Sequence, residues 1–216
     1  MPTRRLASVL LLLCCATASQ AETLRLTVTD SETGQSLENA VVELISAAAA
    51  VTPQQAVLDQ IDKEFVPPVT VIPQGSRVNF PNSDDILHHV YSFSAAKTFD
   101  IPLYGQGTNS SYEEVFETAG VVEIGCNIHD WMLAYIYVAE SALAGTTDAT
   151  GMVDLTGLTP GSHQLKIWHP RMPGTAGLTQ TIQIQTGATT ELSLAVELGR
   201  DRRIRRAPST TRNRYR

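Results

Sequence analysis

Three residues with metal-binding side chains stand close together in one short segment. Cys126, His129 and Met132 follow one another at Cys-x2-His-x2-Met spacing within the stretch GCNIHDWM. A thiolate, an imidazole and a thioether can converge on one point when the strands on both sides fix the ends of their loop. The pattern therefore predicts a compact metal site with three donor atoms from one loop.

A fourth donor is expected from the upstream stretch PNSDDILHHVYSF, in which a polar loop ends in His88 and His89. Adjacent residues of a strand point to opposite faces, so one of the two is expected to face the metal. One Cys, two His and a weak Met form a soft donor set suited to copper in both oxidation states. Zinc is disfavoured because structural zinc sites have little use for a thioether. The alternative is three core residues that share a loop by chance.

The first residues of the chain have the pattern of an export signal. Residues 1–21 contain two arginines, an apolar stretch and a small-residue exit. Cleavage would remove Cys14 and Cys15 and leave Cys126 alone in an oxidising compartment, which we expect to be the periplasm. Metal ligation would protect such a thiol, and a buried inert core cysteine is the alternative. No stretch is long and apolar enough for a transmembrane span.

Charge is distributed unevenly along the chain. Residues 22–198 hold 6 Lys and Arg against 21 Asp and Glu, a net charge of −15, while residues 199–216 hold 8 Arg against one Asp, a net charge of +7. The basic tail has few apolar residues, so we expect it to be disordered and able to contact an anionic surface or the acidic body. Export would place the protein away from nucleic acid, so no nucleic-acid partner is expected.

Alternating apolar residues and regularly spaced turns predict an all-β protein. The expected strands are 23–29, 40–45, 69–72, 77–80, 89–93, 112–116, 121–124, 133–138, 181–185 and 191–196, with further strands between 145 and 170. The stretch 47–59 is expected to be a short helix or a loop. The spacing in the middle of the chain is typical of a Greek-key sandwich or barrel.

The middle of the chain resembles the cupredoxins, and its Cys-x2-His-x2-Met loop has the amicyanin spacing. The similarity is greatest to the methylamine utilisation protein group of periplasmic plastocyanin-like proteins, and it covers about residues 60–139. The stretches VNFPN, HHVYSF and GCNIHDWM carry it. The stretch TDATGMVDLTGLTPGSHQLKIWHP resembles the carboxypeptidase regulatory-like or transthyretin-like β-sandwich modules, which have a binding or structural role.

The resemblance implies a Greek-key cupredoxin barrel that holds one copper ion cycling between Cu(I) and Cu(II). The implied ligands are His88, Cys126, His129 and Met132. Asn82 stands six residues before His88, as the loop Asn of cupredoxins does, and would brace the ligand loops. His89 would then lie outside the ligand set, next to it.

The residues beside these candidates are expected to have mainly structural roles. Asp84 and Asp85 are expected to form a solvated turn. Trp131 is expected either to pack over the site and exclude water or to be an ordinary core residue. The prolines that amicyanin-like loops carry around the His are absent here, where Asn127 and Ile128 stand instead.

The expected domains are a signal peptide (1–21), N-terminal strands (22–52), a copper domain (53–140), a regulatory-like sandwich (141–198) and the tail (199–216). The second sandwich has few strands, so the N-terminal strands are expected to complete it.

The predicted function is that of a one-electron carrier whose partner is another exported redox protein, a cytochrome or a dehydrogenase. The alternative is a copper-binding, copper-storing or structural module without electron transfer. An enzyme is not expected, because four protein ligands leave no open position for a substrate.

Overall fold

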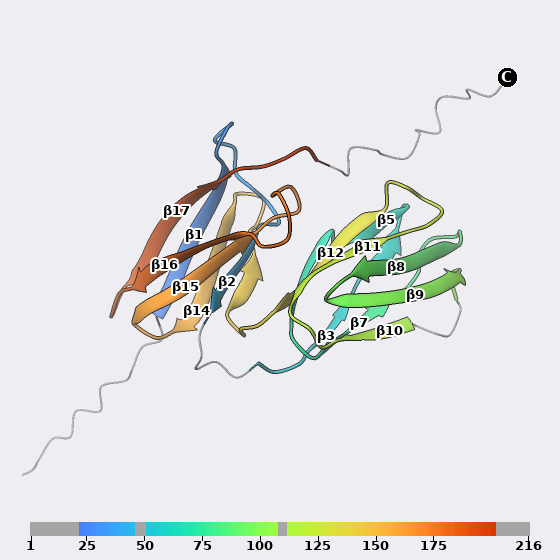
Figure 1. The fold of residues 1–216 in the computed structure, drawn as a ribbon, viewed down its shortest axis with the longest axis horizontal. Helices are drawn as coiled ribbons and strands as arrows, with labels where there is room; N and C mark the ends of the chain where they lie inside the picture. Colours follow the sequence, from blue (N-terminus) through green and yellow to red (C-terminus); the bar gives the residue numbers. More distant parts are fainter. Residues whose placement is uncertain (1–21, 46–50, 108–111, 202–216) are drawn as a thin grey trace, which may run out of the picture.

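The computed structural model describes residues 22–45, 51–107 and 112–201, which form two β-sandwiches side by side (Figure 1). Within these ranges all the regular secondary structure is β-strand, which confirms the predicted all-β fold class. Among these residues no helix is long and apolar enough to cross a membrane. The expected export signal (1–21) and most of the expected tail lie outside the described residues.

The first sandwich, here called the terminal sandwich, is built from both ends of the described chain. Its strands are β1 (Glu22–Asp30), β2 (Val41–Ile45), β13 (Ala144–Thr146), β14 (Met152–Leu158), β15 (Gly161–Trp168), β16 (Leu178–Ile184) and β17 (Thr189–Val196). They form one sheet of order β14-β1-β17 and a second of order β13-β2-β15-β16. Alternation along β1 buries Leu24, Leu26 and Val28 in the core between these sheets.

The second sandwich, here called the central sandwich, is inserted between β2 and β13. Its strands are β3 (Gln55–Val57), β4 (Asp59–Ile61), β5 (Glu64–Val66), β6 (Val69–Pro73), β7 (Ser76–Phe80), β8 (His88–Ser94), β9 (Lys97–Tyr104), β10 (Tyr112–Phe116), β11 (Gly120–Gly125) and β12 (Leu133–Ala139). A sheet of order β6-β12-β11-β8-β9 faces one of order β10-β7-β3, and β4 pairs with β5 as a separate hairpin.

The expectation of a helix or loop over 47–59 is wrong for residues 55–57 and 59, whereas residues 51–54 belong to no helix or strand, as expected of a loop. Residues 55–57 form β3, which pairs in parallel with β7, and residue 59 begins β4, the first strand of a hairpin. Strands of three residues are too short to display the alternation that identifies a strand in a sequence. Their pairing with remote strands defines them instead.

An apolar cluster joins the two sandwiches. It combines Val41 and Trp168 of the terminal sandwich with residues of β6, β11 and β12, and the rings of Tyr135 and Trp168 lie 5.3 Å apart between centroids. The carboxylate of Glu43 is fully buried beside this cluster and accepts hydrogen bonds from the Tyr137 hydroxyl (2.7 Å) and the Ser141 backbone N–H (2.8 Å). Burial, together with the nearby Glu43, raises the pKa of Tyr137, so its hydroxyl keeps the proton that it donates.

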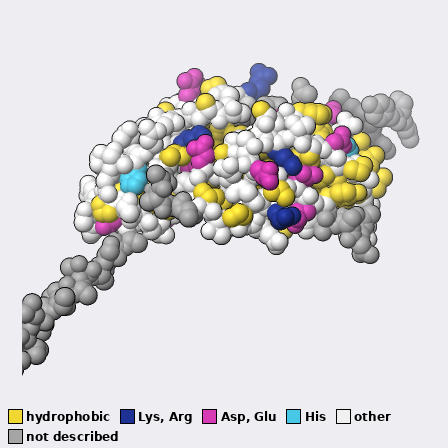
Figure 2. Space-filling model, turned by 60° about the horizontal axis from the view of Figure 1, so that its bottom comes forward, with side chains coloured by type: hydrophobic (Ala, Val, Ile, Leu, Met, Phe, Trp, Pro, Cys, Tyr) yellow, Lys and Arg dark blue, Asp and Glu magenta, His cyan; other side chains and the backbone are white. Residues whose placement is uncertain are grey.

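Lys and Arg side chains lie beside acidic ones on the surface of the molecule, as on the face in Figure 2. Arg77 pairs with Glu113 at 2.7 Å and Arg25 with Asp154 at 2.9 Å, and all four side chains are substantially exposed. Exposed pairs of this kind contribute little to stability. Residues 22–198 hold 21 acidic against 6 basic side chains, so this part of the molecule carries a net negative charge.

Replacement of Tyr137 by Phe tests the buried contact between the sandwiches. The variant leaves one oxygen of the Glu43 carboxylate buried without its donor, so we expect the free energy of unfolding to fall by about 1–3 kcal/mol. Urea denaturation followed by tryptophan fluorescence measures the change. Tyr112→Phe is the matched control, because it removes a hydroxyl from a partly exposed ring. Equal losses in the two variants would contradict a role for the Tyr137–Glu43 bond.

Candidate metal centre

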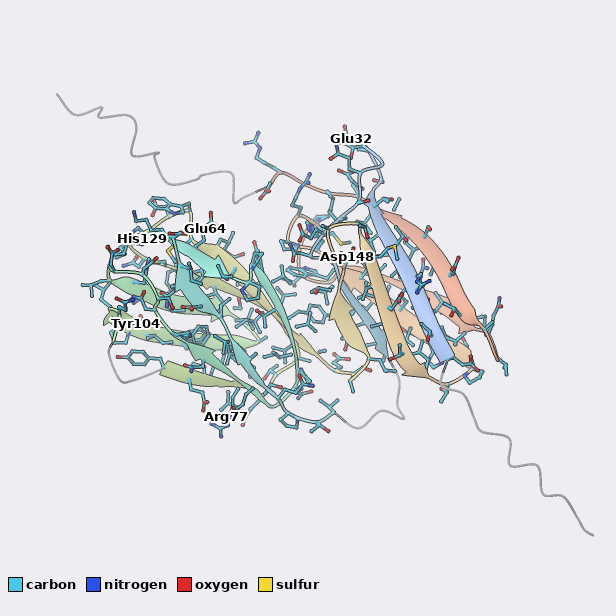
Figure 3. The ribbon with its side chains drawn as sticks, turned by 180° about the vertical axis from the view of Figure 1, so that it is seen from behind. Glu32, Glu64, Arg77, Tyr104, His129 and Asp148 are labelled. Atoms are coloured by element: carbon cyan, nitrogen blue, oxygen red, sulfur yellow. The ribbon has the colours of Figure 1, made fainter. Side chains whose placement is uncertain are left out.

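The sheet order brings the predicted donor residues to one end of the central sandwich. β11 lies between β8 and β12 and runs antiparallel to both, so the start of β8, the end of β11 and the start of β12 meet at the same edge. His88 is the first residue of β8, and Cys126 directly follows β11. The loop from Cys126 to Met132 then leads into β12. Figure 3 shows His129 of this loop and Arg77 on opposite sides of the central sandwich.

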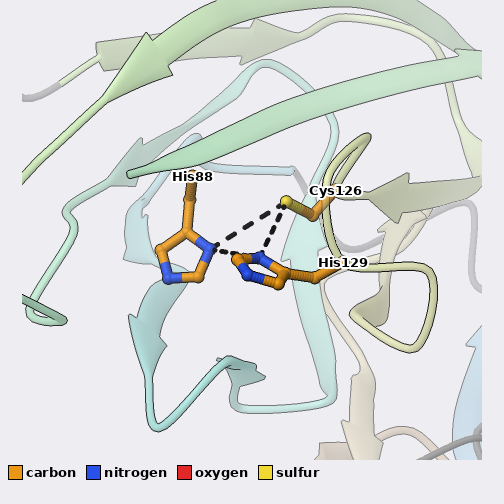
Figure 4. A group of neighbouring side chains, drawn as sticks. All are labelled: His88, Cys126 and His129. Atoms are coloured by element: carbon orange, nitrogen blue, oxygen red, sulfur yellow. Dashed lines mark hydrogen bonds between the residues drawn. The ribbon is translucent and has the colours of Figure 1, made fainter. Parts of the chain in front are cut away.

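Three donor atoms face one another at this edge (Figure 4). The Cys126 Sγ atom lies 3.9 Å from Nδ1 of His88 and 3.6 Å from Nδ1 of His129, and the two Nδ1 atoms are 3.1 Å apart. A transition metal lies about 2.0–2.3 Å from a nitrogen or sulfur ligand. Two ligand atoms of the same ion can therefore be up to about 4 Å apart, or slightly more. All three pairs are within that reach, so a single metal ion fits the arrangement.

Burial favours the neutral form of His129, which is the form that binds a metal. His88 is fully buried and Cys126 is 4% exposed, whereas His129 is partly exposed. Burial lowers the pKa of His129, and the neighbouring His88 and Lys63 lower it further. A neutral imidazole offers its lone pair to a metal, and nothing has to be deprotonated at neutral pH for His129 to bind.

The other sequence candidates lie in different surroundings. Met132 is 2% exposed and belongs to the same core cluster as Cys126, and its backbone N–H donates to the carbonyl of His129. His89 points away from the cluster, and its Nε2 lies 2.7 Å from the Asp100 carboxylate. The structure thus brings together His88, Cys126 and His129.

Asn82 links the loop before His88 to the neighbouring strand. Its Nδ2 donates hydrogen bonds to the carbonyls of Ile86 and Tyr104, each at 2.9 Å, and its Oδ1 accepts from the backbone N–H of Asp84 at 3.0 Å. Asn82 is 8% exposed, so these bonds satisfy polar groups that water hardly reaches. They fix the path of the chain into His88.

The expectation of a solvated turn is wrong for Asp84. Its side chain is 11% exposed, and its Oδ2 lies 2.7 Å from Nε2 of His88, on the ring edge opposite the donor cluster. Burial raises the pKa of Asp84, but hydrogen bonds from the Lys63 and Asp62 backbone N–H groups and from His88 outweigh burial and hold the pKa below its usual value. The sequence did not predict this contact, because the backbone partners of Asp84 lie in the turn between β4 and β5. Those strands are too short to be identified from the sequence.

Trp131 packs beside the exposed ligand candidate. Its ring centroid lies 5.3 Å from that of His129, and its Nε1 donates to the carbonyl of Lys63 at 3.1 Å. Next to His129 the surface forms a hollow whose lining includes Leu87 and Ile128, which are 52% and 46% exposed. The partly exposed histidine is therefore bordered by apolar side chains.

Three similar solved structures each cover less than half of this chain. The purple cupredoxin from Nitrosopumilus maritimus is similar at 25% identity with a TM-score of 0.34, over 38% of this chain and 98% of that one. A reduced Cu(I) form of a mutant amicyanin is similar at 19% identity with a TM-score of 0.35, over 47% of this chain and 99% of that one.

A Cu-containing nitrite reductase from Thermus scotoductus SA-01 is similar at 25% identity with a TM-score of 0.38, over 45% of this chain but 25% of that one. No protein-family model and no curated protein matches the sequence. With TM-scores this low, the assignment of a metal rests on the donor atoms of His88, Cys126 and His129.

Replacement of Asn82 by Asp tests the bracing of the His88 loop. The variant keeps the acceptor for Asp84 but replaces the donor to two carbonyls by an acceptor, so we expect the metal-free protein to lose about 2 kcal/mol of unfolding free energy. Urea denaturation measures it. Asn127→Asp makes the same chemical change at an exposed position of the Cys126 loop and is expected to cost little. A loss in Asn127→Asp as large as in Asn82→Asp would contradict the bracing role.

Proposed function

We propose that the chain is an exported copper-binding protein that carries one electron at a time. The observation that carries this proposal is the convergence of the donor atoms of the buried His88 and Cys126 and the partly exposed His129. A thiolate and two imidazoles are a soft, compact set that suits copper in both oxidation states, and Met132 would add a weak thioether donor. Copper, when bound, supplies the one-electron couple.

The chain's own part in this function is to hold the donors still. His88 begins a strand, Cys126 directly follows one, and the hydrogen bonds that Asn82 and Asp84 make support the loop before His88. A site that keeps one geometry in both oxidation states needs little rearrangement when an electron arrives or leaves. Four protein ligands would leave no position for a substrate, so we propose a carrier and not an enzyme.

His129 would be the point of contact with a redox partner. It is the exposed member of the cluster, and Leu87 and Ile128 give its surroundings an apolar surface that a partner can cover. The net charge of −15 on residues 22–198 would favour a partner with a basic surface, such as an exported cytochrome or dehydrogenase. We place this exchange in the periplasm, in line with the export signal predicted for residues 1–21.

Titration of the purified mature protein with Cu(II), followed by visible absorption, tests this function. We expect an intense thiolate-to-copper charge-transfer band at one equivalent that bleaches on reduction and returns on oxidation. The band is expected to vanish in Cys126→Ser and in His88→Gln.

His89→Gln is the matched control, because it makes the same change one residue away, on the opposite face of β8. The band is expected to persist there. A band that survives in His88→Gln but vanishes in His89→Gln would overturn the ligand assignment. Stoichiometric copper binding without a reversible band would favour a storage or structural module.

A further inference from the structure

The Asp84 carboxylate connects the buried ligand candidate His88 to a turn that lies far from it in the sequence. Its Oδ2 lies 2.7 Å from Nε2 of His88 and accepts a hydrogen bond from the Lys63 backbone N–H at 2.9 Å. Its Oδ1 accepts from the Asp62 backbone N–H at 2.6 Å. Both oxygens are thus held by donors, and the carboxylate has one fixed orientation.

The turn that supplies these donors has a defined geometry. Asp62 and Lys63 have φ values of 53° and 61°, the left-handed conformation of a two-residue turn that closes a hairpin of β4 and β5. Next to Asp84, Ser83 donates its backbone N–H to the carbonyl of Gln60 (3.1 Å) and its hydroxyl to the Asp59 carboxylate (2.8 Å). The hairpin and the loop before His88 are therefore tied together at Asp84 and at Ser83 just before it.

The same turn also reaches the second histidine. The carbonyl of Lys63 accepts the indole hydrogen bond of Trp131, whose ring packs beside His129. One hairpin end therefore supports both imidazoles, through a charged hydrogen bond to His88 and through an aromatic ring beside His129. The two supports differ chemically, because only Asp84 brings a negative charge to a ligand.

The charge of Asp84 has a direct consequence for His88. A carboxylate can only accept a hydrogen bond, so the contact requires the imidazole proton on Nε2 and leaves the lone pair on Nδ1, which faces Cys126 and His129. A carboxylate behind a metal-binding imidazole also makes it a stronger donor. Stronger donation and an added negative charge stabilise the more highly charged oxidation state of a bound metal.

We propose that Asp84 is a positioning residue that lowers the reduction potential of the copper site by favouring Cu(II) over Cu(I). This inference rests on the proposed function and adds to it a regulator of that same site. Asp84 acts through His88 and is not itself a ligand.

The reduction potential of the copper-loaded protein tests this inference. In Asp84→Asn the neutral side chain can still accept a hydrogen bond from His88 but brings no charge. We expect the preference for Cu(II) over Cu(I) to fall about tenfold, which corresponds to a rise of about 59 mV in a one-electron potential. Chelator competition is expected to show weaker Cu(II) binding with Cu(I) binding nearly unchanged. Asp84→Ser, a smaller neutral residue that can accept from the turn, carries the same test if Asp84→Asn does not fold.

Asp85→Asn is the matched control, because it removes the same charge from the next, exposed residue and is expected to leave the potential nearly unchanged. Equal losses of Cu(I) and Cu(II) affinity, with an unmoved potential, would show a purely structural role and overturn the inference. A shift no larger than that of Asp85→Asn would overturn it as well. These outcomes leave the proposed function intact, whereas a wild-type protein without a reversible copper couple overturns both.

Discussion

The antiparallel pairing of β11 with β8 and β12 is the constraint on which the candidate site depends. It places the beginning of two strands and the end of a third at one edge, so His88 meets a loop that lies about forty residues further along the chain. The cores that hold these strands bury their apolar faces, and a register shift of one residue would turn every buried side chain of a strand to the other face. The position of the donors is therefore determined by sheet packing and not by the loops alone.

The close approach of the donors restricts where the imidazole protons can lie. The two Nδ1 atoms are 3.1 Å apart, so one of them must carry a proton for the pair to share a hydrogen bond, and Cys126 lies beside them in a buried place. The hydrogen bonds of Asn82 and Asp84 hold the loop before His88 from outside. A bound cation would take the place of the shared proton, because it accepts electron pairs from all three donors at once.

The sequence predicts the site well where metal-binding residue types occur at the spacing that a metal site needs. Cys126 and His129 share one short loop, and their grouping with one of the two histidines His88 and His89 could be predicted from residue types and spacing. The choice of His88 comes from the resemblance to the cupredoxins. The β4–β5 hairpin and Asp84 could not, because a three-residue strand shows no period and a contact from Lys63 to Asp84 depends on tertiary packing. The all-β class was predictable from alternation along long strands such as β1, whose burial follows the period of two.

We propose that His88, Cys126 and His129 hold one copper ion in a geometry fixed by the sheet. X-ray absorption at the copper edge, on the oxidised and the reduced protein, tests it most directly. We predict one short sulfur and two nitrogen neighbours in both oxidation states, with closely similar distances, because the strands hold the donors in place. Loss of a nitrogen neighbour on reduction, or a first coordination sphere dominated by oxygen, would contradict the account.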